Sequence, residues 1–446
     1  VELDPQLIDL MGRVLPSQAR QVFQDVRLQI ITDDARRFLQ QPGPSYDVII
    51  MALPEPKNAL LNRFYTQEFF AAVKDRLSPH GVFSFGLTGA ETSLSPQRRG
   101  SLALARATLD RVFPEVVVLP GLTWRFFASS QPGLLTSDPE ILLHRQRHRG
   151  LELLYVREYY LKANLTPERR QYARVMLEQA PAQINSDLQP WGLFYGLLLA
   201  GMTENSLLPP ALLWLQLQGV GGLYAAIALI SLGHRGWGQR RTASRHTGFY
   251  LYSVFTMGLA VMGLEVVVLI LFQTTLGYLY GQLSLLLAAF MAGMAGGSYL
   301  AGACLARGWS ASDLAVGGQG GLVLLMGGLG MSLPWILQAP LFREDGWGQA
   351  CFALILIGGG LLGGVVFAAQ GELCRQQGEP LSLSAGRLYA VDLLGATLGT
   401  LGLSFFILPC FGPAQALFLG AAWNLAAILL LVGERLRQLL KVHMSS

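Results

Sequence analysis

The sequence predicts two parts of different fold class, an α/β Rossmann-like domain over residues 1–205 and an all-α transmembrane bundle over residues 206–446. In the first part, short apolar runs alternate with amphipathic stretches, which is typical of strands followed by helices. The second part consists mainly of apolar segments long enough to cross a bilayer. Of the 446 residues, 52% are hydrophobic and 14% are charged, whereas roughly a quarter are charged in soluble proteins. This composition excludes a disordered, fibrous or wholly cytosolic chain.

The elements expected in the first part are four strands with helices between them. The apolar runs that predict strands are 28–32, 47–51, 82–85 and 116–119, and the patterns that predict helices include 64–77 and 100–112. Strands that alternate with helices of this length indicate βαβ units and a mostly parallel, doubly wound sheet.

Acidic residues recur where these strands are expected to end. Glu2 and Asp4 follow one apparent strand end, Asp33 and Asp34 follow the next, and Glu55 follows the third. Ligands of doubly wound sheets bind at the carboxyl ends of the strands. A carboxylate there can accept hydrogen bonds from both hydroxyls of a ribose or from an adenine amino group. Asp is also favoured at helix N-caps, so the spacing alone leaves the ligand and cap interpretations open.

Several short motifs add a resemblance to this pattern. Residues 1–5 (VELDP), 31–39 (ITDDARRFL), 46–50 (YDVII) and 185–190 (NSDLQP), with 290–293 (FMAG) and 388–396 (LYAVDLLGA) in the apolar part, resemble the spermidine synthase family in its membrane-embedded bacterial branch. The order and spacing of these pieces extend the resemblance over most of the chain.

The resemblance implies a class I methyltransferase-like fold and a nucleoside ligand. That ligand would be decarboxylated S-adenosylmethionine, whose aminopropyl group passes to the polyamine putrescine, or the methylthioadenosine part, and no metal is implied. Glu2 would hold the ribose hydroxyls, Asp34 with the Ala35 backbone would hold the adenine, and Asp33 would also belong to the cofactor-binding residues. Tyr65, in a segment similar to the one that closes over the family's substrate, would line the pocket, although a packed aromatic is an equal alternative.

Two departures from the family pattern bear on catalysis. The family's third strand ends in Asp-Ser-x-Asp-Pro or Asp-Leu-Pro-Asp-Pro, and its first carboxylate takes the proton of the attacking ammonium. Here that position is Ala52, which cannot act as a base, and Glu55 stands at the second carboxylate, where it is the remaining catalytic candidate. The family's glycine-rich loop would precede Val1, so we expect the domain to be N-terminally incomplete.

The second part is predicted to form about seven transmembrane helices. The apolar segments are 209–233, 248–273, 279–304, 313–335, 349–373, 386–410 and 414–433, and glycines four apart in several of them favour close helix packing. Glu265 and Asp392 lie inside these segments and mark either a satisfied interhelical contact or an ion or substrate path. Gln282, Gln319 and Gln370 are their candidate partners.

The arginines near the span ends predict an orientation. Arg and Lys gather on one side, at 235, 240, 241, 245, 307, 375, 387, 435, 437 and 441, and the other side's short loops contain only Arg343. With seven spans, this distribution places the α/β domain on the non-cytoplasmic side of a bacterial inner membrane. The domain has no strongly basic balance, so nucleic acid is not an expected partner.

Three functions fit the sequence. One is a binding or scaffold module that has lost aminopropyl transfer, the second is an active polyamine aminopropyltransferase, and the third is a polyamine transporter or an accessory subunit of a larger membrane complex. The expected partners are accordingly the lipid bilayer, a polyamine or nucleoside, and other membrane subunits.

Overall fold

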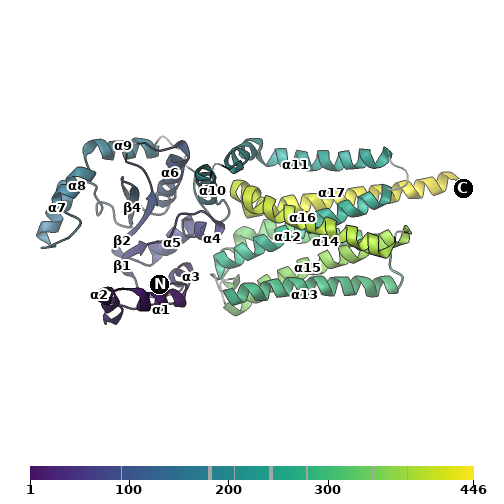
Figure 1. Cartoon of the computed structure of the whole chain (residues 1–446), viewed down its shortest axis with the longest axis horizontal. Helices are drawn as coiled ribbons and strands as arrows, with labels where there is room; N and C mark the ends of the chain where they lie inside the picture. Colours follow the sequence, from purple (N-terminus) through teal and green to yellow (C-terminus); the bar gives the residue numbers. More distant parts are fainter. Residues whose placement is uncertain are drawn as a thin grey trace. The chain divides into compact units, whose positions relative to one another are not determined.

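The computed structural model divides the chain into two compact units, Val1–Asn205 and Ser206–Ser446 (Figure 1). The structure describes residues 1–91, 93–178, 183–204, 206–240, 245–277, 280–342, 345–378 and 380–445. Arg241 and Arg343, which enter the orientation argument, lie outside these ranges.

The first unit is built on a four-stranded mixed sheet with the order β1-β2-β4-β3. The strands are β1 (Tyr46–Met51), β2 (Leu77–Thr88), β3 (Glu115–Leu119) and β4 (Thr123–Ser129). β1 and β2 are parallel, whereas β4 is antiparallel to both β2 and β3. The Rossmann-like fold is therefore confirmed, but the expectation of a mostly parallel sheet is wrong for the described residues.

The antiparallel strand β4 follows from the short connection that precedes it. Only residues 120–122 separate β3 from β4, and so short a link can join antiparallel strands but not parallel ones. The sequence also contains the signal for β4, because Trp124, Phe126 and Ala128 are buried at alternate positions.

The strand expected at 28–32 does not form. The only ladder contact there is an isolated parallel bridge between Glu2 and Thr32, in which the Glu2 N–H donates to Ile31 O over 2.9 Å. Leu28 and Ile30 are exposed. Among the described residues no longer strand pairs with this segment, so its backbone does not form the repeated hydrogen bonds of a strand.

The described residues of the first unit also form ten α-helices. They are α1 (Pro5–Val14), α2 (Ser17–Arg20), α3 (Ala35–Gln40), α4 (Ala59–Asn62), α5 (Gln67–Asp75), α6 (Pro96–Asp110), α7 (Pro139–His148), α8 (Glu158–Asn164), α9 (Pro167–Glu178) and α10 (Trp191–Thr203), with a 3-10 turn at Gln21–Gln24. The predicted helices 64–77 and 100–112 correspond to α5 and α6, whose starts are fixed by the caps Thr66 and Ser95.

An aromatic core fixes the sheet against α5. Phe70, Phe83, Phe85 and Phe126 are almost completely buried, and the Phe85 and Phe126 rings stack with centroids 5.0 Å apart. Such ring contacts add to the free energy of apolar burial. The core thus holds β1 and β2 in place, so that the positions of the loops at their carboxyl ends are well defined.

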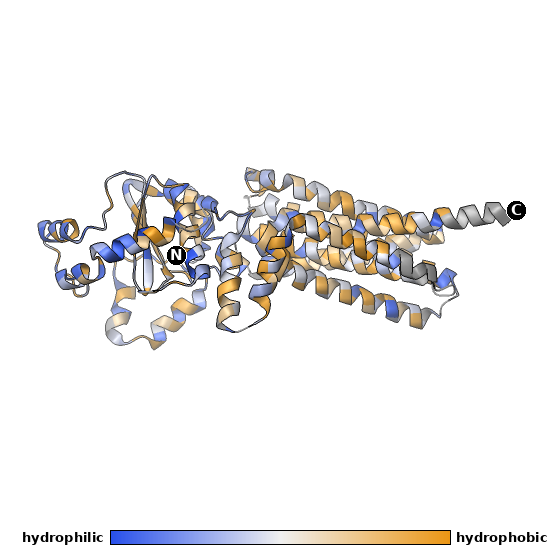
Figure 2. Cartoon of the chain, turned by 90° about the horizontal axis from the view of Figure 1, so that it is seen from above, coloured by the Kyte–Doolittle hydropathy of each residue, from blue (hydrophilic) through white to orange (hydrophobic). Residues whose placement is uncertain are grey.

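The second unit is a bundle of long apolar helices. They are α11 (Leu208–Arg240), α12 (Arg245–Thr275), α13 (Tyr280–Ala306), α14 (Ala311–Ile336), α15 (Asp345–Gln376), α16 (Leu381–Gly402) and α17 (Leu408–Ser445). By length and composition, six helical stretches among the described residues can span a membrane, and Figure 2 shows their hydrophobic residues in orange (Figure 2). This composition indicates a membrane protein.

The sixth stretch contains the last two predicted spans. It covers residues 382–433, 52 residues in all, which is far longer than the roughly 20 residues that cross a bilayer. The helix is broken at Gly412, which has φ 80°, and the chain turns back between α16 and α17 (Figure 1). The expected hairpin near Pro409 and Pro413 is therefore present, and seven remains an approximate count.

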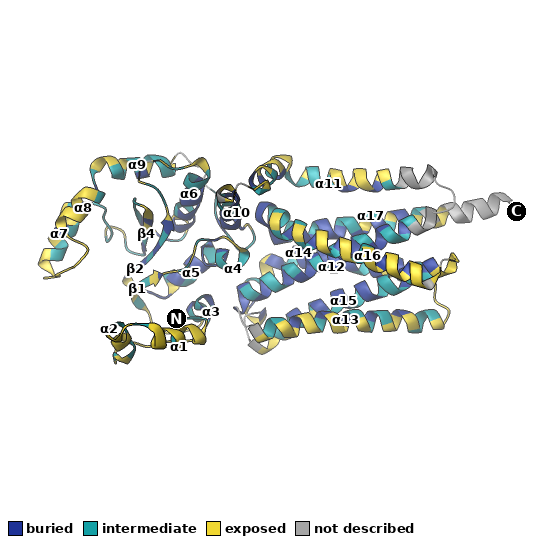
Figure 3. Ribbon diagram, in the orientation of Figure 1, coloured by how far each residue is buried: buried dark blue, intermediate teal, exposed yellow. Residues whose placement is uncertain are grey.

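Helix α12 is the centre of the bundle. In its most apolar window 67% of the residues are buried, against 17% for α11 and 22% for α13. Figure 3 colours the buried residues dark blue (Figure 3). Small residues permit the close packing that was expected. A Cβ on Gly297 of α13 would lie 2.0 Å from Leu361 O of α15, so only glycine fits there.

The buried polar groups of the bundle are paired differently from expectation. Gln319 Nε2 donates to Ser253 Oγ over 2.8 Å, and Gln370 Nε2 donates to the same oxygen over 2.8 Å. These two glutamines are therefore partners of Ser253 on α12, and the expectation that they pair with Glu265 or Asp392 is wrong. Glu265 is 5% exposed, and Asp392 lies against Gly258 of α12.

Candidate functional site

The first group of predicted site residues lies around the Glu2–Thr32 bridge. Glu2 Oε1 accepts hydrogen bonds from the N–H groups of Leu3 (2.8 Å) and Asp4 (3.1 Å). Asp33 N–H donates to Glu2 O over 3.1 Å, and Asp33 Oδ1 accepts from Asp34 N–H. The structure thus brings Glu2 and Asp33 side by side.

Asp34 is a buried helix cap and one half of an ion pair. Its carboxylate accepts from the N–H groups of Arg36 (3.0 Å) and Arg37 (3.3 Å) at the start of α3, where Ala35 is the first helical residue. It also pairs with the guanidinium of Arg63, whose pKa is lowered by burial although Asp34 opposes the shift. The cap interpretation is therefore observed, and a ligand would have to compete with Arg63.

A second buried ion pair adjoins the first. Arg36 Nη1 lies 2.9 Å from Asp187 Oδ1, and Arg36 Nη2 lies 2.5 Å from Asp187 Oδ2, in a bidentate arrangement. Arg36 Nη1 also donates to Arg63 O over 2.6 Å. Burial lowers the Arg36 pKa, but the neighbouring Asp187 outweighs it, so that the net pKa is raised. This pair links α3 to the segment that precedes α10.

Glu68 and Asn185 extend this polar network. Glu68 Oε2 accepts from Asp187 N–H over 3.1 Å, and its pKa is raised by burial and by the Asp187 charge. Asn185 Nδ2 donates to Asn62 Oδ1 and to Tyr65 O, both over 2.9 Å. Sequence analysis missed Arg36, Arg63 and Glu68. Their partners lie far away along the chain, and no local pattern signals such pairing.

The loop after β1 contains the altered catalytic position. Ala52 is exposed and offers no group for proton transfer. Glu55 Oε1 accepts from Thr88 N–H (2.7 Å) at the end of β2 and from Arg98 Nη1 (2.8 Å) on α6. Burial raises the Glu55 pKa, but the hydrogen bonds from Thr88 and Arg98 outweigh it, so that the pKa is below its usual range. Glu55 therefore joins the carboxyl ends of the two parallel strands.

Tyr65 closes over the same loop. Its hydroxyl donates toward Pro54 O (3.0 Å) and Leu53 O (3.2 Å), and its ring packs edge-on against Phe85, with centroids 5.6 Å apart. Burial, followed by the Glu55 charge, raises the Tyr65 pKa. Tyr65 is thus a packed aromatic that fixes the loop, and it places its ring beside Glu55.

Helix α10 packs directly on this region. A Cβ on Gly196 would lie 2.1 Å from Pro56 O, and one on Gly192 would lie 2.2 Å from Asn62 Oδ1. The helix backbone therefore touches both the loop after β1 and α4, and no side chain fits between them. Tyr65 and α10 thus both contact this loop.

These residues form two groups that share the segment 62–66. Glu55, Tyr65 and Ala52 form one group, and the ion pairs of Asp34 and Arg36 form the other. Within the ranges that the structure describes, no cluster of three or more metal-binding side chains occurs. Every carboxylate at this edge already accepts hydrogen bonds from the protein, so the arrangement can bind polar groups only by exchanging partners.

Comparison with known proteins gives a family match for part of the chain. Residues 1–94 match the family described as Spermine/spermidine synthase domain. This match supports the family resemblance of the N-terminal segment.

Curated relatives match over short segments. A polyamine aminopropyltransferase of Corynebacterium efficiens is 32% identical over 123 residues, which is 27% of this chain and 24% of the relative. Polyamine aminopropyltransferase 2 of Bacillus anthracis is 39% identical over 85 residues, 19% of this chain and 24% of the relative. Polyamine aminopropyltransferase 2 of Hyperthermus butylicus is 31% identical over 148 residues, 31% of this chain and 45% of the relative. The chain thus spans less than half the length of these relatives.

Two solved structures are also similar. Spermidine synthase from Thermotoga maritima has 24% sequence identity and a TM-score of 0.31, covering 40% of this chain and 58% of that chain. A spermidine synthase in complex with the transition state analogue AdoDATO has 24% identity and a TM-score of 0.30, with the same coverage.

Proposed function

We propose that this chain is a membrane protein whose spermidine synthase-like domain serves as a binding or scaffold module without aminopropyl transfer. The observation that carries the proposal is the state of Glu55, the carboxylate left in the altered loop. Its Oε1 is held by Arg98 and by Thr88 N–H, and its pKa is lowered. A carboxylate so stabilised is a weak proton acceptor, and efficient general bases have a pKa near the working pH.

The nucleoside side of the domain supports the same proposal. Asp34 would accept the adenine amino group by resemblance, but here Arg63 and two N–H groups of α3 occupy its carboxylate. Exchange of a buried guanidinium for a neutral ligand is unfavourable, because Arg63 would lose its counter-ion inside the protein. Decarboxylated S-adenosylmethionine or methylthioadenosine would therefore bind weakly.

An aminopropyl-transfer assay on Ala52→Asp tests the catalytic part. We expect the full-length protein in detergent to transfer no aminopropyl group to putrescine, before or after this substitution. A measurable rate in the unaltered protein that rises by two powers of ten or more in Ala52→Asp would instead identify an active aminopropyltransferase with Glu55 or water as its base.

Calorimetric titration with methylthioadenosine and with decarboxylated S-adenosylmethionine tests the ligand part. The matched variants are Asp34→Ala, which removes the candidate acceptor, and Arg63→Met, which releases it. We expect no micromolar binding in the unaltered protein. Micromolar binding that disappears in Asp34→Ala would contradict the scaffold proposal and establish a nucleoside site.

Glu265 supports transport as a second candidate function. It lies on the central helix α12, is 5% exposed, and such groups in spans often line ion or substrate paths. Polyamine uptake into vesicles that falls at least tenfold in Glu265→Gln and Asp392→Asn would support transport, whereas unchanged uptake would exclude it. Solitary migration of the protein after gentle solubilisation would count against an accessory subunit of a larger complex.

The expected side of the domain, away from the cytoplasm, is testable by labelling of a cysteine introduced at exposed Leu122 in intact cells.

A further inference from the structure

Strand β3 is the end strand of the sheet. Its only partner among the described residues is β4, to which it pairs from Glu115 to Leu119. In an antiparallel pair, alternate residues direct their N–H and C=O groups away from the partner. The outer edge of β3 therefore presents unpaired backbone groups, and such an edge can accept a further strand.

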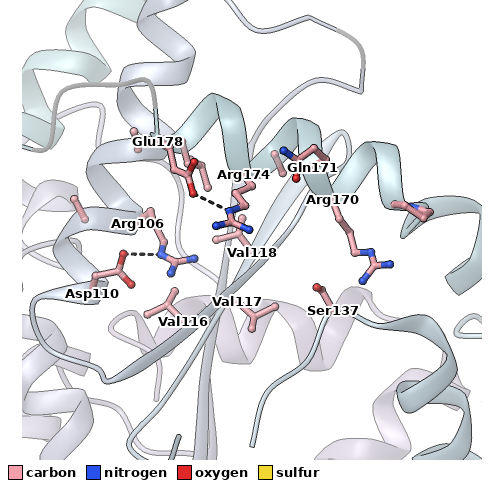
Figure 4. A pocket seen from close by; sticks show the side chains of 15 residues that line it. Arg106, Asp110, Val116, Val117, Val118, Ser137, Arg170, Gln171, Arg174 and Glu178 are labelled. Carbon is pink, nitrogen blue, oxygen red and sulfur yellow. Dashed lines mark hydrogen bonds and ion pairs between the residues drawn. The ribbon is translucent and has the colours of Figure 1, made fainter. Parts of the chain in front are cut away.

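A groove of about 800 Å³ runs beside this edge. Val116, Val117 and Val118 of β3 line one side, helices α6 and α9 form the other, and Ser137 lies at one end, as Figure 4 shows (Figure 4). Because three consecutive residues of β3 reach the groove, its lining includes the strand edge as well as one face. This volume is large enough for several residues of an extended peptide.

Arginines from α6 and α9 point into the groove. Arg106 Nε lies 2.7 Å from Asp110 Oδ2, and Arg174 Nε lies 2.8 Å from Glu178 Oε1 (Figure 4). In both pairs the hydrogen bond to the carboxylate uses Nε, and the terminal nitrogens have no hydrogen-bond partner within the described part of the chain. These nitrogens remain able to bind a further anion.

Arg170 is less well paired than the other two. Its Nη1 lies 3.9 Å from Asp138 Oδ2, which is beyond hydrogen-bond distance. Its Nε is buried and has no hydrogen-bond partner in the described residues. A buried donor without an acceptor is unfavourable. Because Nε is buried, an incoming carboxylate would meet the terminal nitrogens of Arg170 and would reach Nε only after the side chain turns.

We propose that this groove binds an extended acidic peptide segment of a partner protein, which adds to β3 as a fifth strand. Alternate residues of a strand point to one face, so carboxylates at alternate positions can reach Arg106, Arg170 and Arg174 on the helix side. The backbone of the segment pairs with the free edge, and the valines of β3 contact its apolar side chains. This interaction uses other elements than the nucleoside site and is independent of the proposed function.

The free edge of β3 lies beside the arginines of the groove, and this combination favours a peptide over other ligands. A small anion would use the arginines but leave the edge of β3 unpaired. A polyamine would meet three guanidinium groups and only two carboxylates, those of Asp110 and Glu178, so the excess positive charge disfavours it. A merely solvated helix face would explain the pairs of Arg106 and Arg174, but it would not use the edge of β3, which is unpaired among the described residues.

Fluorescence anisotropy on the full-length protein in detergent tests the proposal. The probe is a labelled heptapeptide of alternating aspartate and valine, and the control peptides have lysine for aspartate or N-methyl groups on alternate amides. We expect binding of the first peptide only, because lysine reverses the charge and N-methylation removes the donors that pair with β3. Binding should weaken as salt rises, because the charges are partly exposed.

Variants of the groove supply the second arm. Arg170→Gln with Arg174→Gln should weaken binding at least tenfold, whereas Arg147→Gln, which removes an exposed arginine paired with Glu158 outside the groove, should leave it unchanged. The proposal would be overturned if the N-methylated peptide bound as tightly as the first peptide, or if pentaphosphate displaced the probe. Either result would show a site for anions that does not require an added strand. Absence of binding at millimolar peptide would also overturn it.

Discussion

Arg63 and Asp34 form an ion pair inside the α/β unit, with side chains only 4% and 1% exposed. The pair joins the loop before α5 to the start of α3, and Arg63 also lies over the ring of Phe64, 4.6 Å from its centroid. A charge so deeply buried is tolerated only when its partner is present.

Arg63→Met therefore tests the stability of the unit. The substitution leaves the Asp34 charge buried without its counter-ion, and we expect a loss of about 3–5 kcal/mol in the free energy of unfolding. Pulse proteolysis of the full-length protein in urea measures this loss. Arg147→Met, which breaks an exposed pair, should cost less than about 1 kcal/mol, and equal losses in the two variants would refute the role of burial.

Glu55→Gln tests the carboxylate at the strand ends. Hydrogen bonds from Thr88 and Arg98 hold the folded-state pKa of Glu55 below its usual range, so its ionised form stabilises the fold at higher pH, and this contribution disappears as pH falls through the folded-state pKa. We expect the variant to be about 1–2 kcal/mol less stable at pH 7 and to approach the unaltered protein in acid. Urea titrations at several pH values measure the difference, with exposed Glu91→Gln as control. A difference that does not change with pH would contradict this assignment.

Gly196→Ala tests the contact between α10 and the loop after β1. The added methyl would lie 2.1 Å from Pro56 O, so the loop or the helix must move, at a cost of about 1–3 kcal/mol. We expect faster tryptic cleavage after exposed Lys57. Gly221→Ala adds a methyl that meets nothing within 4 Å and should leave the cleavage rate unchanged. The same rate in all three proteins would show that α10 does not hold the loop.

Ser253→Ala tests the polar centre of the bundle. The variant removes the oxygen to which Gln319 and Gln370 donate, and we expect a stability loss of about 1–2 kcal/mol, the range of interhelical hydrogen bonds in membranes. Thermal unfolding in detergent measures it. Thr274→Val removes a hydrogen bond within one helix only and should have a smaller effect. If the two variants unfold alike, Ser253 does not join the helices.

Local patterns were sufficient to predict the class of both units and several elements. The apolar run 47–51 forms β1, which pairs in parallel with β2. Glycines such as Gly297 lie where helices approach closely. The run 28–32 has the composition of a strand but forms only one bridge, because a strand needs a paired neighbour and its own sequence does not reveal whether one is present.

The candidate site was predictable only as a set of positions. The sequence places Asp34 and Glu55 after predicted strand ends, but it cannot show that Arg63 and Arg98 occupy their carboxylates. These pairings join residues 29 and 43 positions apart, and no local period encodes them. The roles of Glu2, Asp33 and Tyr65 toward a ligand remain proposals.

The ion pair between Arg36 and Asp187 determines where the chain can be truncated. A water-soluble fragment that stopped before residue 183 would still contain the sheet, but it would lack Asp187 and Asn185, and the buried Arg36 would lose its bidentate carboxylate partner. Such a fragment should aggregate during expression. Any truncation made to study the α/β unit alone must therefore extend through residue 190.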